Sequence, residues 1–442
     1  MLMQLQEALD FILGWPVVIY VLGLSIVCTF VIQWAQVRYF FTAWQIALMP
    51  SDQKKDAKAD MTPLQAFINT LSSNLGNGSI AGVATALCLG GPGAPVWILI
   101  VGFFLMAVRF VEIYLSLYFS MDKNKKSTFG GPMRYLHDVP FGSYLAYIYA
   151  LFGLSYGLLI GNAAQTNSIA LSLHKTWHID PLITAVLFTL FVAYVMVGGA
   201  QRITKMNEAI VPVKVVVFFA ASIALLGYHY AAIIPALVFM SKAAFSGTAI
   251  FGGFAGFTVI QAMRFGVSRV TFATESGVGT AAILFGSTGS KEPVKDAILG
   301  MLSTFISSLV CFLIGLCIVA SGVWDNGLTS TPLTISAFET VFGVCAGWIV
   351  SFLSISFGAG VLVAYGYVTR ETWRYVMNDR YPLLFVILFC TMAFFGAVAN
   401  VEAIWLAGEV ANAGMLFINM FGLAYLLPVV YSAVCAYKQK KR

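Results

Sequence analysis

Residues 73–95 read SNLGNGSIAGVATALCLGGPGAP and lie inside an apolar segment that is long enough to cross a membrane. The first half of this stretch is crowded with small and amide residues: Asn74, Gly76, Asn77, Gly78, Ser79 and Gly82. A helix in lipid has to satisfy its own backbone hydrogen bonds, and glycines and amides at this density interrupt that pattern. The stretch therefore predicts a transmembrane helix that is broken part-way across the bilayer.

The composition places the whole chain in a membrane. Of its 442 residues, 60% are hydrophobic and only 10% are charged, and the mean hydropathy is +0.86. Soluble domains carry roughly 25% charged residues. A soluble protein this apolar would expose large patches that aggregate. We therefore expect an all-α polytopic membrane protein without a separate soluble domain.

The hydrophobic segments divide the chain into about eleven candidate transmembrane helices, each near the length of roughly 20 residues that a bilayer requires. They lie near 14–37, 62–89, 95–120, 141–173, 181–199, 208–228, 250–266, 293–322, 341–366, 382–399 and 405–434. We expect residues 1–60 to form an extra N-terminal helix with a cytoplasmic loop. Residues 61–434 would form a ten-helix core with halves at 61–240 and 241–434, and residues 435–442 a basic cytoplasmic tail.

The basic residues predict the orientation of the chain. The net charge is +6, but nearly all lysines and arginines fall on one side if the loop after the first helix is cytoplasmic. Only Lys175 and Lys242 fall on the other side, and Arg109 and Lys214 lie within helices. This positive-inside bias predicts an outside N-terminus and a cytoplasmic C-terminus. It also explains the basic excess without a nucleic-acid partner.

Ten core helices can form two halves of five that enter the membrane from opposite sides. Such inverted repeats often begin each half with a broken helix, and the two breaks meet at a binding site near mid-membrane. A second glycine cluster, FGGFAG at 251–256, follows the first by about 176 residues. Close helix packing through small residues is the alternative explanation of each cluster. The matching positions favour the repeat.

A broken helix offers chemistry that suits an amino acid and a cation. The N-terminal end of the second half-helix carries a positive partial charge that suits a carboxylate, whereas released carbonyls suit a cation or an ammonium group. In the segment 141–173, glycines at 153, 157 and 161 recur every four residues and lead to Gln165 on the same helix face. Gln165 is either a structural interhelical hydrogen-bonding residue or a ligand contact.

Several motifs resemble those of the alanine or glycine:cation symporter family. They are GNGSIAGVATALCLGGPGAPVW (76–97), GGPMRY (130–135), GNAAQTNS (161–168), GGFAG (252–256), RFGVSR (264–269) and FATESGVGT (272–280). The resemblance runs in one register from about residue 60 to 430. It implies a leucine-transporter-like fold, an inverted five-helix repeat, plus one extra N-terminal helix.

The resemblance also implies sodium- or proton-driven uptake of a small neutral amino acid such as alanine or glycine, in a bacterial inner membrane. The substrate-binding residues that we expect are Gly76, Asn77, Gly78, Ser79, Gln165, Gly253, Phe254, Gly256 and Tyr365. The ion-binding residues that we expect are Leu75, Gly78, Ser354 and Ser356. We expect no cofactor beyond the coupling ion. The expected partners are the substrate and the lipid bilayer. A monomer is plausible, and the oligomeric state is left open.

The chain departs from the family pattern at two places. The usual Gly-Thr-Gly-Asn segment has Asn77 and Ser79 in place of its Thr and Asn. A Thr-Thr pair that helps to hold sodium aligns with Gly360 and Val361, and a tryptophan aligns with Tyr365. A valine side chain offers no oxygen to a hard cation. Ser354 and Ser356 lie one to two turns away and could replace the hydroxyls, so the coupling ion is left open between sodium and the proton.

Charges within membrane segments are costly and mark functional or paired sites. Arg109 and Glu112 are three residues apart and can pair on one helix face, as a structural pair or as part of a gate. Lys214 follows Glu208 toward a cytoplasmic end, and we expect its amine to snorkel to the interface. Glu275, in a glycine-flanked loop, could cap a short helix or close the inner gate.

Three classes of function remain to be compared. A secondary transporter is favoured, with Glu409 as a further candidate for a proton site. An intramembrane enzyme is disfavoured because the sequence has no HExxH motif and no nucleotide-binding glycine loop. A substrate-binding sensor or a channel-like protein on the same fold is the alternative, because the missing threonines would matter less without ion coupling.

Overall fold

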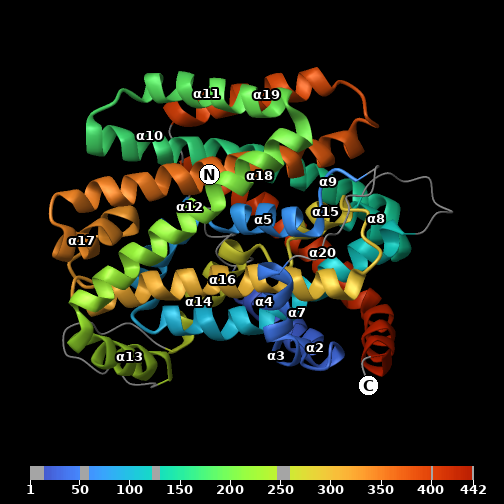
Figure 1. Cartoon of the computed structure of the whole chain (residues 1–442), viewed down its shortest axis with the longest axis horizontal. Helices are drawn as coiled ribbons and strands as arrows, with labels where there is room; N and C mark the ends of the chain where they lie inside the picture. Colours follow the sequence, from blue (N-terminus) through green and yellow to red (C-terminus); the bar gives the residue numbers. More distant parts are fainter. Residues whose placement is uncertain (1–13, 50–58, 122–129, 246–258, 400–401, 441–442) are drawn as a thin grey trace.

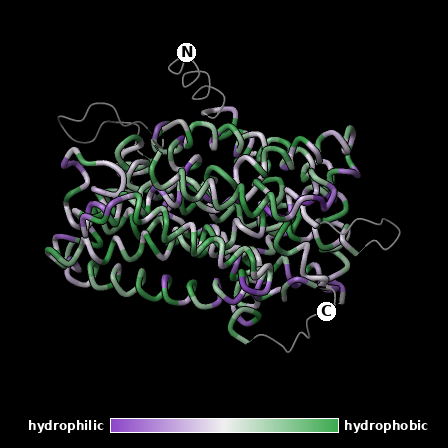
Figure 2. The backbone as a smooth tube through the Cα atoms, turned by 90° about the horizontal axis from the view of Figure 1, so that it is seen from above, coloured by the Kyte–Doolittle hydropathy of each residue, from purple (hydrophilic) through white to green (hydrophobic). Residues whose placement is uncertain are grey.

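The computed structural model describes residues 14–49, 59–121, 130–245, 259–399 and 402–440. Within these ranges every regular element is helical. Figure 1 shows most of the helices packed side by side along the long axis of the molecule. Figure 2 shows hydrophobic residues along most of the chain. Together with the apolar composition, this arrangement is that of an integral membrane protein.

The helices follow one another with short connections. In chain order they are α2 (Trp15–Val31), α3 (Ala35–Arg38), α4 (Phe40–Leu48), α5 (Pro63–Asn74), α6 (Asn77–Gly90), α7 (Ala94–Ser120), α8 (Pro132–Tyr135), η1 (Leu136–Asp138), α9 (Gly142–Leu158), η2 (Leu159–Ala163), α10 (Ala164–Trp177), α11 (Pro181–Val197), α12 (Gly199–Tyr228), α13 (Tyr230–Phe245), α14 (Val259–Thr274), α15 (Thr280–Gly286), α16 (Pro293–Ala320), α17 (Ser330–Phe342), α18 (Cys345–Val376), α19 (Pro382–Val398) and α20 (Glu402–Lys440).

Six helical segments among the described residues are long and apolar enough to cross a membrane. They are Ala94–Ser120, Gly142–Trp177, Gly199–Tyr228, Pro293–Ala320, Cys345–Val376 and Ile404–Gln439, and five shorter apolar helices accompany them. Helices coincide with most of the predicted spans, although the predicted 250–266 lies partly outside the described residues and only α14 is seen there. The number of membrane crossings and the inverted repeat stay predictions.

The first predicted span, 14–37, is too long, because α2 ends at Val31 and Gln33 and Trp34 have positive φ angles. Three other helices extend beyond their predicted spans. α12 begins at Gly199 rather than near 208, and α18 continues to Val376 rather than ending near 366. α20 continues to Lys440, through most of the predicted tail 435–442. These extensions carry polar and charged residues, which can remain helical where a helix emerges from the hydrocarbon layer. Hydrophobicity alone therefore places the apolar part of each helix but not its polar ends.

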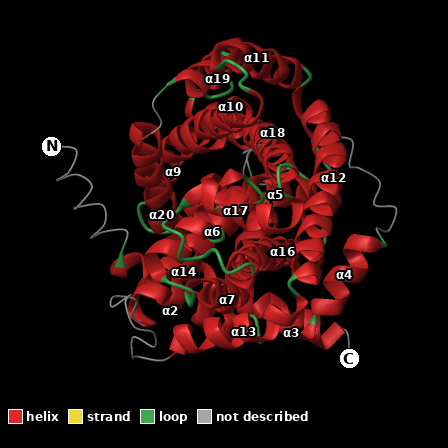
Figure 3. Cartoon of the chain, turned by 90° about the vertical axis from the view of Figure 1, so that its left-hand side faces the viewer, coloured by secondary structure: helices red, strands yellow, loops and turns green. Residues whose placement is uncertain are grey.

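The broken helix lies near the middle of the bundle. Figure 3 shows α5 and α6 surrounded by other helices when the molecule is seen end-on. α5 packs against α12, α16 and α18, while α6 packs against α14, α16 and α17. α2 packs against α7, α14 and α20. Its assignment as an extra helix outside a ten-helix core stays a prediction.

Candidate functional site

The break in the central helix falls between Asn74 and Asn77. α5 starts with a capping box formed by Thr62 and Gln65 and ends at Asn74, where Leu75 leaves helical geometry with φ −89° and ψ 75°. Gly76 is extended, with φ −112° and ψ −177°, and α6 starts at Asn77. The predicted break is therefore present, and it exposes backbone groups of both half-helices in the centre of the protein.

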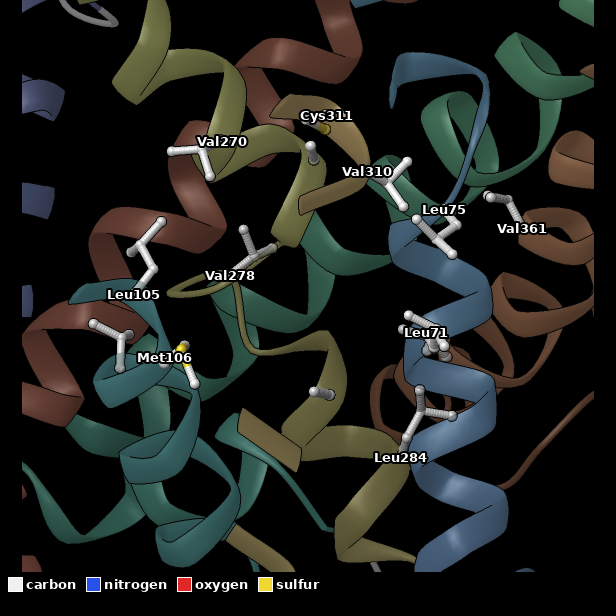
Figure 4. Close-up of a cluster of buried hydrophobic side chains, with 14 of the residues drawn as sticks. Leu71, Leu75, Leu105, Met106, Val270, Val278, Leu284, Val310, Cys311 and Val361 are labelled. Atoms are coloured by element: carbon white, nitrogen blue, oxygen red, sulfur yellow. The ribbon is translucent and has the colours of Figure 1, made fainter. Parts of the chain in front are cut away.

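Gly76 is needed at the break because its neighbours leave no room for a side chain. A Cβ atom there would lie 2.8 Å from Cγ2 of Val361 and 3.5 Å from Oε1 of Gln165. Figure 4 shows Val361 of α18 beside Leu75 at the end of α5. The break is thus closed on one side by an aliphatic side chain, at one of the two positions where the resemblance led us to expect threonine.

Gln165 reaches the break across the bundle. Its Oε1 accepts a hydrogen bond from the backbone N–H of Asn77 at 3.4 Å, and its Nε2 donates to the carbonyl of Ile160 at 3.1 Å. That carbonyl is exposed by η2, a π-helical turn over Leu159–Ala163 that immediately precedes α10. Such turns widen a helix locally and often occur at functional sites. The structure brings Gln165 and the first turn of α6 together.

The break also holds two asparagine amide groups without a hydrogen-bond partner. Nδ2 of Asn74 and Nδ2 of Asn77 are both buried and unpaired within the described part of the protein. Ser79 is satisfied, because its hydroxyl donates to the carbonyl of Asn74 at 3.2 Å and thereby bridges the break. Buried amides without partners are costly, so two of them at one point suggest a polar ligand there.

A cavity of about 470 Å³ leads from one end of the bundle to the start of α6. Asn77, Gly78 and Gly82 of α6 line it on one side, and Lys175 of α10 lies at its rim. Its remaining walls include Asn167, Ser172, Arg269, Phe272, Trp405 and Glu409. Lys175 lies in the last turn of α10, so the cavity extends toward that end of the bundle.

The opposite end of the broken helix is closed by charged contacts. Oδ2 of Asp60, just before α5, accepts a hydrogen bond from the Tyr367 hydroxyl at 2.8 Å and pairs with Arg370 at 3.3 Å. Glu371 joins Arg370 to Arg374 through ion pairs of 3.0 Å and 2.9 Å. These contacts hold the start of α5 against α18. Access to the break is therefore open at one end and closed at the other.

Glu275 and Tyr365 are neighbours. The Tyr365 hydroxyl donates a short hydrogen bond to Oε1 of Glu275, and the Thr280 hydroxyl donates to Oε2 at 2.7 Å. The ring of Tyr365 lies 5.7 Å from that of Tyr156. Glu275 therefore binds two hydroxyl groups near the start of α15, and that helix has no side-chain cap on its backbone N–H groups. A role in an inner gate stays a prediction.

Arg109 and Glu112 form the predicted ion pair. Their side chains are fully buried and 3.3 Å apart. Arg109 also donates to the carbonyl of Thr274, while Glu112 accepts from the backbone N–H of Gly277 at 2.9 Å and from Asn419 at 2.8 Å. The pair thus fixes the loop between α14 and α15 rather than contacting the helix break.

The expected position of Lys214 is wrong. Its amine does not snorkel to the membrane surface; the side chain is fully buried and donates to Ser72 and Leu75 at the end of α5. Lys214 is far enough from the end of α12 to lie between the other helices, where the carbonyls of the break provide acceptors. The sequence did contain a signal for a functional role of Lys214, because ionisable residues within apolar segments often mark functional sites.

The hydroxyl groups of Ser354 and Ser356, which we expected to bind the ion, do not contact the helix break in the described residues. Ser354 accepts a hydrogen bond from Ser172 of α10 at 2.9 Å, and Ser356 donates to the carbonyl of Leu353 in its own helix at 3.0 Å. Gly78 faces the ring of Phe272, since a Cβ atom there would lie 3.4 Å from it. Gly253, Phe254 and Gly256 lie outside the described residues.

The sequence analysis missed several members of this site. The π-helical turn, the carbonyl partners of Lys214 and the closure by Asp60 and Arg370 all depend on contacts between distant segments. Asn74, Arg269 and Phe272 were part of quoted motifs but were given no role. Asn74 borders the glycine run, which was a usable signal for a polar contact at the break.

Comparison with known proteins identifies the family of this chain. The model of the sodium:alanine symporter family matches residues 2–442. The chain belongs to that family. Similar proteins include the sodium/alanine symporter AgcS of Methanococcus maripaludis, at 31% identity over 98% of this chain and 96% of that protein. The probable sodium/glutamine symporter GlnT of Bacillus subtilis is 27% identical over 99% of this chain and 92% of that protein.

A solved structure shares the fold of this family member. A sodium-coupled sialic acid symporter, in a substrate-bound outward-open state, superimposes with a TM-score of 0.56 and 14% identity, over 93% of this chain and 86% of that one. At this identity the likeness concerns the arrangement of the helices alone.

Proposed function

We propose that the protein is a secondary active transporter that carries a small neutral amino acid, such as alanine or glycine, across the plasma membrane together with a cation. Membership of a symporter family supports the reaction class. The names of the relatives, which include a sodium/alanine and a probable sodium/glutamine symporter, support an amino acid as substrate. The transported cation is sodium or a proton.

The helix break carries this proposal. It places the first turn of α6, including the unpaired amide group of Asn77, in the wall of one cavity. Gln165 and Asn74 contact this first turn through Asn77 and Ser79. The carboxylate of an amino acid would bind near Gly76–Ser79, where the helix dipole and released N–H groups favour an anion.

Alternating access follows from the two ends of the broken helix. In the described state the cavity is open at the Lys175 end, while Asp60 and Arg370 close the other end. We propose that substrate binding at the break favours closure of the first end and separation of Asp60 from Arg370. The division into an N-terminal helix and two five-helix halves, the outside N-terminus and the bacterial inner membrane belong to the same proposal.

The test is uptake of labelled alanine and glycine into proteoliposomes that contain the purified full chain. We expect accumulation above the external concentration when an inward cation gradient is imposed. Sodium and proton gradients are applied separately, each with a cation ionophore as the control that removes the gradient. Binding without accumulation under either gradient would instead identify a sensor, and passive equilibration alone would identify a channel-like protein.

Gln165→Ala is expected to weaken substrate binding without unfolding the protein. Gln165 shapes the break through Asn77 and Ile160, and one lost hydrogen bond to a charged group costs about 1.5–3 kcal/mol, roughly a ten- to hundredfold rise in KM. Initial uptake rates over a range of alanine concentrations measure it. Gln201→Ala, an exposed position on α12, is the matched control. An unchanged KM in a well-expressed Gln165→Ala would remove this residue from the site.

A further inference from the structure

A lysine side chain lies where the helix break meets α18. Lys214 of α12 is fully buried, and its Nζ donates to the Leu75 carbonyl at 3.0 Å, the Ser72 carbonyl at 3.1 Å and the Ser72 hydroxyl at 3.3 Å. An ammonium group has three N–H donors, and here it faces three oxygen acceptors. The ring of Phe357 lies 5.4 Å from the same nitrogen. Every donor of the ammonium group is thus matched.

The acceptors are groups that the break releases. The last backbone hydrogen bond at the end of α5 runs from the Leu75 N–H to the Leu71 carbonyl. The Ser72 carbonyl therefore lacks the helical donor that it would have in an unbroken helix. The C-terminal end of α5 also carries a negative partial charge, which favours a cation there. These are the features that would otherwise attract a metal cation.

Gly360 of α18 lies beside the amine of Lys214. At Gly360 a Cβ atom would lie 2.5 Å from Oγ of Ser72 and 2.7 Å from Nζ of Lys214, both too close for a real contact. Gly360 is also one of the two positions that align with the threonine pair expected to hold sodium in the family pattern. A side chain at position 360 would displace the Ser72 hydroxyl and the Lys214 amine from their observed positions, so glycine at 360 is compatible with the contact between these two groups.

No carboxylate neutralises Lys214 among the described residues, since none lies within 4.0 Å of its amine. α5, which supplies its acceptors, contains no acidic, basic, tyrosine or cysteine side chain. Tyr365 on α18, one turn beyond Gly360, is hydrogen-bonded to Glu275. Glu208 on α12 is hydrogen-bonded to Gln65 near the opposite end of α5. The described residues therefore give the Lys214 amine three hydrogen-bond acceptors but no counter-ion.

We propose that Lys214 is a built-in cation of the helix break: its ammonium group occupies the position between α5 and α18 that a sodium ion would require. The inference rests on the proposed function, because it concerns how this chain prepares its amino-acid site. The consequence is that the substrate binds without sodium. A sodium ion at this place would have to displace the lysine from all three of its acceptors.

Binding of labelled alanine to the purified full chain tests the inference. Measurements in NaCl and in choline chloride at equal ionic strength should give dissociation constants within about a factor of two, since no sodium-dependent step contributes free energy. A tenfold or greater rise in affinity with sodium, roughly 1.4 kcal/mol, would overturn it. This comparison uses the unmodified protein, so it does not depend on the folding of a variant.

Lys214→Met tests whether the ammonium group is needed. It keeps the length of the side chain but leaves the carbonyls of Ser72 and Leu75 without a donor, and we expect at least about a tenfold loss of alanine affinity. Lys205→Met, at an exposed position of the same helix, is the matched control. If Lys214→Met does not fold, Lys214→Gln removes the charge and keeps hydrogen-bond donors. Wild-type affinity in a folded Lys214→Met or Lys214→Gln would overturn the inference.

Failure of the proposed function would be visible separately. If the wild-type protein binds neither alanine nor glycine, the proposed substrate class is wrong. Thermal unfolding then tests whether Lys214 occupies the position of a sodium ion. A ligand that binds the folded state raises the unfolding midpoint. An equal midpoint in NaCl and choline chloride agrees with a site filled by Lys214. If the wild-type protein unfolds at a higher temperature in NaCl than in choline chloride, and Lys214→Met shows the same difference, the inference is overturned.

Discussion

Gly76→Ala is expected to abolish most of the transport activity. The new Cβ atom would lie 2.8 Å from Cγ2 of Val361, whereas its distance of 3.5 Å to Oε1 of Gln165 is an ordinary contact. The backbone at Gly76 has a negative φ of −112°, so the effect is one of space rather than of backbone strain. Overpacking costs about 1–3 kcal/mol, which corresponds to roughly a five- to hundredfold loss of uptake rate.

A second substitution can separate local crowding from general damage. Val361→Ala removes the two methyl groups that meet the new Cβ atom, so Gly76→Ala/Val361→Ala should recover much of the uptake rate. Gly227→Ala on α12 is the matched control, because a Cβ atom there meets nothing within 4 Å. Initial alanine uptake, corrected for the amount of protein in the membrane, is the measurement. A double variant no more active than Gly76→Ala would show that contact with Val361 does not shape the site.

The features that the sequence predicted correctly are those that local chemistry determines. Gly76 and its neighbours interrupt a helix whatever surrounds them, and this interruption is present between α5 and α6. Arg109 and Glu112 are three residues apart on one helix, a spacing that brings side chains together before any tertiary contact is known. The apolar runs located most of the long helices because bilayer thickness sets their length.

The features that the sequence analysis missed depend on contacts between segments that are distant in the chain. Lys214 was expected at the membrane surface because its own helix offers no partner; its acceptors belong to α5, about 140 residues earlier in the chain. The Asp60–Arg370 contact joins residues that are 310 positions apart. Local propensity holds no information on such pairs. The π-helical turn before Gln165 depends on packing against α18 and α19 and likewise has no clear pattern in a single sequence.

Arg109→Met is expected to cause a large loss of stability. Both members of the pair are fully buried, and removal of Arg109 leaves the Glu112 carboxylate without its counter-ion in the protein interior. Breaking one partner out of a buried pair costs about 3–5 kcal/mol. The loop between α14 and α15 should loosen as well, because Arg109 binds the carbonyl of Thr274. Thermal unfolding of the purified protein in detergent measures the effect as a lower midpoint.

Neutralising the partner should restore part of that stability. In Arg109→Met/Glu112→Gln the amide oxygen can still accept hydrogen bonds from Gly277 and Asn419, and no unpaired charge remains. Lys295→Met provides the comparison, since Lys295 and Glu292 form an ion pair with the same spacing at the surface, where such pairs contribute about 0–1 kcal/mol. Arg109 also donates to the Thr304 hydroxyl at 3.4 Å. A double variant as unstable as Arg109→Met would assign the loss to the hydrogen bonds of Arg109 with Thr274 and Thr304 rather than to the unpaired carboxylate. An Arg109→Met variant no less stable than Lys295→Met would show that the pair does not stabilise the fold.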